Sequence, residues 1–523
     1  MKRLEAIQMS LLFFHAALSV FAVSPNLAVW TEVVTRNEPV SVLVKMGRPL
    51  NLSQLQGLSP EPLKRSLEIA KALESHLENE VEKEAPWIKK GPSEGIESVT
   101  PLWLVGAVRV RAKPEAIEKL LIVKGASSMS LEKSKPIHAL FDNEVTLRSP
   151  DPTERIEPED IGWGVRKIGA PETWKQGVEG KGVIVAVLDS GINVNHPDLA
   201  GNIWKNEGET GTDSDGNDKS TNGVDDDKNG FVDDVYGWNF EENSSDISDY
   251  LGHGTQAAGI IAGQGAGGTH TGVAPKAKVM ALRSCCLLGG EVAESAIWES
   301  IQYAMKQGAR VLSMSVSMKH WGKPSYLHWR RASEVLNTAG IVHVNSAGNR
   351  GHGNEPFNIG APGSNPPAWL HPLQSQEGQA LSSMITVGAV DYEDHLRQYS
   401  SIGPVTWEHV PGYEDFPYNK GERKGLIKPD LCAPSETPSL SMDGENYTLS
   451  FGGTSSSTPH VAGAVALLLS ENPKLTVAQI TESLQMSAVP VDGEFTNRCG
   501  AGRLNVQAAL DYVRNRFKQG PTK

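Results

Sequence analysis

Three hydroxyl side chains follow two glycines in the segment FGGTSSSTPHVAG, which covers residues 451–463. Serine and threonine are favoured at helix N-termini, because their oxygens accept the free amide hydrogens of the first turn. Pro459 and the apolar run behind it are typical of such a helix. Capping accounts for one serine, whereas three hydroxyls behind a glycine pair also fit a nucleophile at the start of a helix.

Other polar residues follow apolar, strand-like runs. Asp189 comes directly after VIVAVL, Asn349 follows IVHV, and His253 stands between two glycines before an apolar helix pattern. Because ligands meet the carboxyl ends of parallel strands, we expect these side chains to converge with one of the serines. An attacking serine, a histidine that takes its proton and an aspartate that orients the histidine perform nucleophilic acyl transfer. Taken singly, each residue equally fits a turn, a cap or a packed side chain.

Several ordered blocks of the sequence are similar to those of subtilisin-like serine proteases, the subtilases. VLDSGI resembles the catalytic-aspartate block, HGTQAAGI resembles the histidine block HGTHVAGI, and GTSSSTPHVAG resembles the serine block GTSMASPHVAG. SAGN resembles the oxyanion block, and GVAP, VGAV, KPDLCAP and GAGRLNV match flanking structural blocks. The chain order Asp, His, Ser is also that of subtilisin. The resemblance extends from about Gly162 to Leu510.

The resemblance implies a serine endopeptidase that acts on proteins or peptides. It assigns the nucleophile to Ser455, the general base to His253 and the orienting carboxylate to Asp189. Asn349 takes the role of hydrogen-bond donor to the developing oxyanion. His460 lies nearer to the nucleophile in the sequence, but the resemblance implies a structural histidine inside the helix.

The resemblance also indicates where substrate binds: the expected residues are Ser315, Val316, Ser317 and Gly348. The first three stand where the family commonly has SLG, and this segment is expected to pair with substrate as a strand. Ser317 in place of glycine is expected to narrow the pocket beside it, which accepts the substrate side chain before the scissile bond.

Two alternatives stand against this activity. One is a catalytically inactive binding protein on the same scaffold, which the loss of a triad residue would signal, but all three residues are present. The other is a lipase or esterase of the α/β-hydrolase type, which needs G-x-S-x-G and the order Ser, Asp, His. Neither feature occurs around Ser455, so this second class is excluded.

The elements that must position these residues alternate between strands and helices. Apolar strands are predicted within KGVIVAVLDSGI, AKVMALRS, RVLSMSVS, IVHVNSAGN and MITVGAV. Helices are predicted in SAIWESIQYAMKQGA, in YLHWRRASEVLNTAG and behind Ser455. This alternation predicts an α/β fold, with a mostly parallel sheet and helices on both faces, over residues 151–513. Residues 514–523 are expected to form a C-terminal tail.

A smaller unit is predicted before this domain. Residues 38–140 show the order β-α-β-β-α-β of a ferredoxin-like α+β sandwich, without a residue pattern that suggests catalysis. Residues 141–160 are rich in Asp, Glu and Pro and read as an exposed linker. By the family resemblance, residues 23–150 are a propeptide that inhibits the protease and assists its folding. Its cleavage is expected between about Ala139 and Glu157.

Length, charge and the N-terminus restrict location and partners. The 523 residues exceed one ordinary core, and the net charge of −13 disfavours nucleic acid, because phosphate binding needs clusters of lysine and arginine. Residues 1–22, MKRLEAIQMSLLFFHAALSVFA, resemble a secretory signal, and a single membrane anchor is the alternative although the run is short for a span. A secreted or periplasmic monomer is therefore expected, with membrane contact only through the signal peptide.

A second motif, VDDDKNGFVDD, indicates calcium. Asp225, Asp227, Asn229 and Asp233 follow the D-x-[DN]-x-[DN]-G pattern in which short oxygen side chains converge around a glycine turn. Tyr236 stands where an EF-hand has glutamate, so the motif is not an EF-hand. The resemblance favours structural Ca²⁺, because many subtilisin-like proteases bind it at surface loops, and a solvated acidic loop is the alternative.

The chain contains four cysteines, and export would permit disulfides. The adjacent Cys285 and Cys286 are expected to be buried small residues rather than a bonded pair, because the ring that such a bond closes is strained. A bond between Cys432 and Cys499 is compatible with the sequence, which does not specify the pairing.

Overall fold

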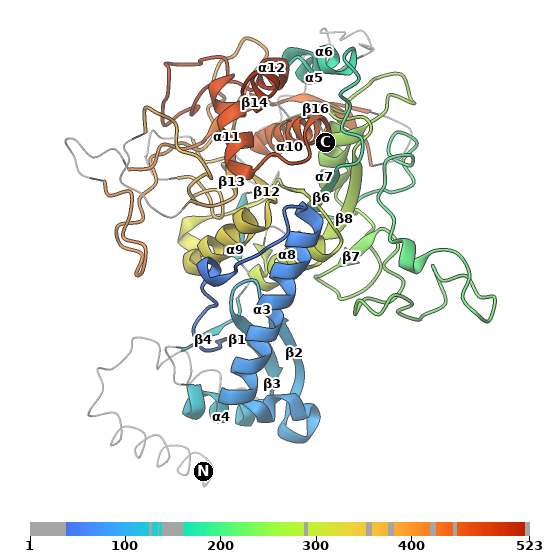
Figure 1. Ribbon diagram of the computed structural model, residues 1–523, viewed down its shortest axis with the longest axis vertical. Coiled ribbons are helices and arrows are strands. Elements are labelled where there is room, and N and C mark those ends of the chain that lie inside the picture. The colour runs from blue at the N-terminus through green and yellow to red at the C-terminus, as the bar shows by residue number, and fades with distance from the viewer. Residues whose placement is uncertain are drawn as a thin grey trace. The chain divides into compact units, whose positions relative to one another are not determined.

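The computed structural model describes residues 38–124, 128–133, 135–138, 161–286, 291–351, 358–374, 381–418, 425–442 and 447–517 (Figure 1). The expected signal peptide, the expected linker and the whole of the expected cleavage region lie outside these residues. The described residues form two compact units, one from 38–50 and 72–133 and the other from 51–71 and 135–517. The domain boundaries expected from the sequence remain predictions. Among the described residues, no helix combines the length and apolarity that a bilayer crossing requires.

The first unit is a four-stranded sheet with helices. Its elements in chain order are β1 (Val40–Lys45), the C-terminal part of α3 (Pro62–Glu84), β2 (Ile96–Leu102), β3 (Ala107–Ala112), α4 (Pro114–Lys124) and β4 (Met129–Leu131). The strand order is β2-β3-β1-β4, and β1 is antiparallel to both of its neighbours. Leu73, Leu77 and Val81 recur every fourth residue of α3 and are buried, which explains why this segment folds as a helix against the sheet. The predicted order of elements is confirmed.

The second unit is built on a seven-stranded sheet whose strand order is β14-β13-β12-β10-β6-β8-β7. The strands are β6 (Ile184–Asp189), β7 (Gly237–Asn239), β8 (Lys278–Arg283), β10 (Val311–Met314), β12 (Val342–Ser346), β13 (Met384–Val390) and β14 (Leu431–Pro434). Every neighbouring pair is parallel. The central strands are apolar along nearly their whole length because both faces are covered. The predicted α/β fold is confirmed.

Helices cover both faces of this sheet. In Figure 1 the strands β6, β12 and β13 lie between α10 on one side and α8 and α9 on the other. The helices are α5 (Trp163–Lys167), α6 (Ala170–Trp174), α7 (His253–Ala262), α8 (Glu294–Lys306), α9 (Tyr326–Ala339), α10 (Gly453–Glu471), α11 (Val477–Met486) and α12 (Val506–Arg516). Helix α10 is buried along almost its whole length and contacts β12, β13 and β10, so the core lies between it and the sheet.

Two small sheets complete this unit. One is the antiparallel pair β15 (Thr437–Leu440) and β16 (Tyr447–Phe451), which leads into α10. The other has three strands, in which β5 (Lys135–His138) lies between β9 (Glu291–Val292) and β11 (Ser317–Met318). Both pairings of β5 are antiparallel, with Ser317 opposite His138. A short segment from before the expected linker therefore adds a strand beside the sheet that carries the candidate site.

The cysteines differ in part from expectation. All four lie in described segments and are paired, Cys432 with Cys499 and Cys285 with Cys286. The expectation that the adjacent pair would not bond to itself is wrong for this structure. Cys286 has φ +83°, a left-handed backbone conformation that bulky residues rarely adopt, and this turn after β8 brings the two sulfurs together.

Candidate active site

Asp189 is the last residue of β6, at the carboxyl end of the sheet, and its side chain is only 1% exposed. Its Oδ1 accepts a hydrogen bond from the backbone amide of Ser190 at 2.8 Å. The same oxygen lies 2.6 Å from Nδ1 of His253, within hydrogen-bond distance. An apolar strand thus ends in a buried carboxylate, and that carboxylate is bonded to the histidine that the sequence singled out.

His253 is the first residue of α7, and Asp249 holds this end of the helix. The Asp249 carboxylate accepts hydrogen bonds from the amides of Leu251, Gly252 and Thr255 and from the Thr255 hydroxyl. It also accepts the Ser190 hydroxyl at 2.9 Å. Amide hydrogens at a helix N-terminus lack partners within the helix, and a carboxylate there satisfies them and complements the helix dipole. Asp249 therefore ties the start of α7 to the strand end that carries Asp189.

The glycines around His253 permit a close backbone approach. A Cβ on Gly254 would lie 2.0 Å from the carbonyl oxygen of Gly191, which is far inside van der Waals contact. Gly191 itself has φ +108°. The glycine after the histidine thus lets α7 begin against the turn that follows β6, and this contact sets the histidine beside the aspartate.

Burial and neighbouring charges act in opposite directions on the pKa of His253. Burial by itself would lower the pKa of this histidine, but the charge and hydrogen bond of Asp189 and the nearby charge of Asp249 raise it above its ordinary value. The imidazole also makes an edge-on contact with the ring of Phe451, with ring centroids 5.4 Å apart. The pair can therefore stabilise an imidazolium ion in a buried position.

Ser455 lies in the first turn of α10, and Gly453 at its start has φ +75°. The Ser455 hydroxyl donates a hydrogen bond to the carbonyl oxygen of Ser315 at 3.0 Å, and the Ser315 hydroxyl donates to the Ser455 carbonyl at 3.0 Å. The structure thus brings Ser455 against the carboxyl end of β10 and points its hydroxyl at Ser315. Nε2 of His253 has no hydrogen-bond partner among the described residues.

Asn349 and Gly348, which follow β12, meet the same helix start through Thr454. The amide and the hydroxyl of Thr454 both donate to Oδ1 of Asn349 at 2.9 Å. The Thr454 hydroxyl in turn accepts the Gly348 amide at 3.2 Å. Because backbone N–H groups only donate, these bonds fix Oδ1 as the acceptor and orient Nδ2 of Asn349 away from Thr454.

The expected substrate-binding residues flank Ser455 on the side of β10 and β11. Ser315, Val316 and Ser317 are all buried. The Ser317 side chain packs against Gly360, where an added Cβ would lie 2.8 Å from it, and its hydroxyl lies 3.4 Å from the Ser346 hydroxyl. The Ser317 side chain is therefore packed between Gly360 and Ser346, and its effect on the substrate pocket stays a prediction.

Comparisons with known proteins show the family of this chain. Residues 180–502 match the profile of the Subtilase family. The chain belongs to the subtilase family. It is 30% identical over 346 residues to the major intracellular serine protease of Bacillus subtilis (strain 168), an alignment that covers 64% of this chain and 85% of that one. The chain is 28% identical to thermitase of Thermoactinomyces vulgaris, in an alignment that covers 67% of this chain and 96% of thermitase. It is 26% identical to subtilisin E of Bacillus subtilis (strain 168), in an alignment that covers 76% of this chain and 84% of subtilisin E. This subtilase is a serine-type endopeptidase.

His460 of the subtilase lies inside α10 as expected. Its Nδ1 is 2.8 Å from the carbonyl oxygen of Ser456, one turn earlier, and burial lowers its pKa to about 4. The side chain is fully buried. A neutral histidine that bonds to its own helix agrees with the structural role that the resemblance implied.

The acidic loop of the subtilase gathers only part of the expected metal set. Carboxylate oxygens of Asp225 and Asp227 lie within 4.8 Å of each other and of a carboxylate oxygen of Glu209, a buried residue that the motif does not include. Oε1 of Glu209 accepts the Asp227 amide at 3.0 Å, whereas Oε2 is buried and has no hydrogen-bond partner among the described residues. An unpartnered buried carboxylate oxygen beside two further carboxylates fits a hard, oxygen-seeking cation such as Ca²⁺.

The other two residues of the motif are used differently. Oδ1 of Asn229 accepts the amide of Phe231, and its Nδ2 donates to Asp227 and Asp234. Both carboxylate oxygens of Asp233 accept the amide of Gly223 at 3.2 Å. The structure therefore groups Asp225 and Asp227 with Glu209, and it turns Asp233 toward the backbone of its own loop.

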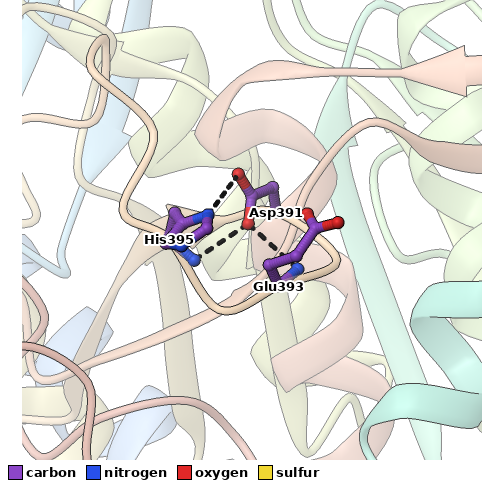
Figure 2. A group of neighbouring side chains, drawn as sticks. All are labelled: Asp391, Glu393 and His395. Atoms are coloured by element: carbon purple, nitrogen blue, oxygen red, sulfur yellow. Dashed lines mark hydrogen bonds and ion pairs between the residues drawn. The ribbon is translucent and has the colours of Figure 1, made fainter.

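A second acidic turn resembles a metal site but has another explanation. Asp391, Glu393 and His395 place ligand atoms close together in Figure 2. Oδ1 of Asp391, however, accepts the amides of Glu393 and His395 at 3.1 and 2.8 Å, and Oδ2 faces Arg397 at 3.5 Å. These are the bonds of an aspartate that stabilises a turn.

Sequence reasoning missed Asp249 and Thr454, which hold the candidate active site, and Glu209, which belongs to the acidic loop. Asp249 could have been found from its place just before GHGT, since aspartate is favoured beside helix starts. Thr454 was visible inside the serine block, but nothing in the sequence indicated a bond to Asn349. Glu209 lies 16 residues before Asp225, outside any motif, and only the folded loop brings the two together.

Proposed function

We propose that this subtilase is an exported serine endopeptidase made as a zymogen, with Ser455 as nucleophile, His253 as general base and Asp189 as the orienting carboxylate. The observation that carries the proposal is the buried pair of Asp189 and His253, 2.6 Å apart, at the same sheet edge as the N-terminus of α10. Buried ion pairs of this kind are costly to desolvate, so their presence beside a helix-start serine favours a catalytic use.

The reaction proceeds in two halves. The Ser455 hydroxyl turns from the Ser315 carbonyl toward Nε2 of His253, gives up its proton there and forms a bond to the scissile carbonyl carbon. The imidazolium, stabilised by Asp189, then passes the proton to the departing amine as the C–N bond breaks. His253 next takes a proton from water, whose oxygen attacks the acyl carbon. The proton returns to the Ser455 oxygen as its bond to the acyl carbon breaks and the carboxylic acid product leaves. Catalytic hydrogen bonds often form only with substrate present.

The negative oxygen of each tetrahedral intermediate is stabilised by donors that are already oriented. Nδ2 of Asn349 is the donor from the side chain, because Thr454 holds Oδ1 of that amide. The Ser455 amide and the N-terminus of α10 supply the second contribution. Such donors act strongly in a buried site, because they need no reorganisation when the charge appears.

The expected propeptide, residues 23–150, is called the leader below, and the pairing of its strand β5 supports the proposal of a self-processing zymogen. Strand β5 pairs with β11 in the antiparallel sense, with His138 opposite Ser317. The Ser455 hydroxyl bonds to the carbonyl of Ser315, two residues before Ser317, and this offset is the basis on which we place the processing site two residues after His138. We therefore propose that self-processing cuts the bond between Leu140 and Phe141. This bond lies within the interval expected from the sequence.

Calcium is proposed as a structural ion of the acidic loop. Glu209, Asp225 and Asp227 would hold it, and the bound ion would supply positive charge that relieves the repulsion among three carboxylates. The loop lies outside the catalytic residues, so the proposed ion takes no part in the reaction. Export agrees with this assignment, because extracellular fluid supplies calcium at concentrations that weak sites can use.

The proposal is tested with the full chain and its Ser455→Ala variant. A fluorophosphonate probe is expected to label the native protein on Ser455, while the variant takes up no label, hydrolyses no casein and stays at full length. Loss of labelling in the native, folded protein would favour a catalytically inactive binding protein. Mass spectrometry of the processed native chain reads the cleavage point, and a mature N-terminus other than Phe141 would contradict the proposed register.

A further inference from the structure

Lys135, the first residue of β5, places its ammonium group beside Glu294 of α8 and the backbone of Lys323. Nζ of Lys135 donates a hydrogen bond to the carbonyl oxygen of Lys323 at 3.1 Å and lies 4.0 Å from Oε2 of Glu294. The Lys135 side chain is 17% exposed and that of Glu294 only 3%. A leader residue outside the expected scissile region thus carries a largely buried positive charge into contact with a buried negative one.

Glu294 is held in place by its own neighbours. Oε1 accepts the Ser325 amide at 2.8 Å and the indole Nε1 of Trp329 at 2.7 Å. Oε2, the oxygen that faces Lys135, accepts the Ser325 hydroxyl at 2.8 Å. Burial raises the pKa of Glu294, and the Ser325 bonds and the Lys135 charge counteract that effect. The orientation of the Glu294 carboxylate is therefore fixed, and the positive charge of Lys135 offsets part of the cost of burying it.

We propose that Glu294 is a specificity-determining residue: with the Lys323 carbonyl it forms a subsite for a lysine or arginine side chain of the chain segment that pairs between β9 and β11. The leader fills this subsite first, through Lys135, and substrates fill it afterwards with a basic residue in the same position. The inference rests on the proposed function, in which substrate pairs with β11 as the leader does.

The chemistry of the subsite favours a long cation. An acceptor carbonyl and a carboxylate suit a group with several donors and a positive charge, and lysine reaches both over an apolar stem. A purely structural role, in which Glu294 only links α8 to α9 through Ser325 and Trp329, predicts no dependence on the residue at position 135. The two roles are therefore separable by changing the peptide rather than the enzyme.

The first test uses peptides with the sequence of residues 131–144, LEKSKPIHALFDNE, and the active native enzyme obtained from the full chain. Norleucine in place of Lys135 keeps the stem and removes the charge, and we expect kcat/KM to fall about tenfold. Arginine at this position is expected to retain the native rate. Norleucine in place of Lys133 is the matched control and is expected to change kcat/KM less than twofold. Equal rates for the two norleucine peptides would overturn the inference, whatever the enzyme variants do.

The second test changes the enzyme. In the Glu294→Gln variant the ratio of kcat/KM between the lysine and norleucine peptides is expected to fall from about ten to below two. Ser325→Ala, which removes one donor to the carboxylate but leaves its charge, is expected to keep the tenfold ratio. A ratio that stays at ten in Glu294→Gln would refute the assignment.

Fluorophosphonate labelling is run on every preparation to separate the two proposals. Labelled, peptide-cleaving enzyme without a lysine preference refutes the subsite alone, whereas absence of labelling in the native chain refutes the proposed function. Should Glu294→Gln fail to mature, self-processing of the full chain with Lys135→Met, compared with Lys133→Met, supplies the second measurement. Lys135→Met is expected to slow processing about tenfold and Lys133→Met to leave it unchanged, and equal processing rates would overturn the inference.

Discussion

Replacing Asp189 with asparagine keeps the shape of the side chain and removes its charge. Oδ1 of Asp189 accepts the Ser190 amide at 2.8 Å and lies 2.6 Å from Nδ1 of His253. If the asparagine oxygen occupies this place, the new NH₂ group takes the place of Oδ2, which is buried and has no hydrogen-bond partner among the described residues. If the NH₂ group occupies it, a donor faces the Ser190 amide and holds His253 in the wrong tautomer.

Both arrangements lose the attraction between the carboxylate and the imidazolium that forms in the transition state. With an effective dielectric constant of about 20 and charge centres about 4 Å apart, this attraction amounts to about 4 kcal/mol. A change of that size corresponds to about 10³-fold in rate. We therefore expect Asp189→Asn to lower kcat/KM for a peptide substrate about 10³-fold. Circular dichroism and thermal unfolding check that the variant folds, and Asp511→Asn, at an exposed position of α12, serves as control.

The pH profile gives a second, independent result for the same variant. In the proposed mechanism the general base is neutral His253, so activity is expected to rise as the pH passes the pKa of this histidine. Asp189 raises that pKa, whereas burial lowers it. The acid limb of the profile is therefore expected to move to lower pH in Asp189→Asn. A loss of rate below tenfold, or an acid limb that stays in place, would refute the reasoning from the buried pair.

Three further predictions concern metal, specificity and acid stability. Glu209→Gln is expected to weaken calcium binding at least tenfold in titration calorimetry, because affinity follows the number of charged ligands. Asp233→Asn is expected to change calcium affinity less than threefold. Equal effects of the two substitutions would contradict the grouping of Glu209 with Asp225 and Asp227. Ser317→Gly removes side-chain atoms that pack against Gly360. In peptides that differ only in the residue before the scissile bond, kcat/KM for phenylalanine relative to alanine is expected to rise about tenfold. An unchanged ratio would show that Ser317 does not limit the pocket. Burial lowers the pKa of His343 to about 3, so the neutral form contributes stability that is complete above about pH 6.5 and is lost as pH falls toward 3. Urea denaturation at pH 8 and pH 5 measures how far the free energy of unfolding falls between these pH values. In His343→Leu this fall is expected to be smaller by about 2 kcal/mol than in the native protein. An identical fall in both proteins would exclude this histidine as a source of the acid instability.

The strands and helices that carry the site could be predicted from the sequence because they are strongly apolar and regular. The run before Asp189 is buried on both faces, and α3 repeats its buried residues every fourth position, so local pattern and tertiary environment agree. The short strand β7 was not predicted, because three residues carry too little pattern, and β14 was missed because its segment was read only as a family block. Cys285 and Cys286 were read as unbonded from local strain, whereas a left-handed turn at Cys286 accommodates their bond.

The residues of the candidate site also divide into those that could be predicted from the sequence and those that could not. The blocks around Asp189, His253 and Ser455 were recognisable because they resemble family blocks, in which the proposed catalytic residues stand next to glycines that permit close backbone approach. The partners that orient them were not recognisable, because Asp249, Thr454 and Glu209 act through single bonds to groups distant in the sequence.

The sequence alone determined the class of fold, and it supplied the proposed reactive groups with their order along the chain, because each is encoded in local pattern or in contiguous blocks. Tertiary structure decided which groups meet: the carboxylate of Glu209 beside the calcium motif, the Thr454 bonds that orient Asn349, and the buried charge of Glu294 facing Lys135 of β5. Such contacts join positions separated by up to 159 residues (294 minus 135), and their formation depends on packing of the whole sheet rather than on any stretch of sequence near them.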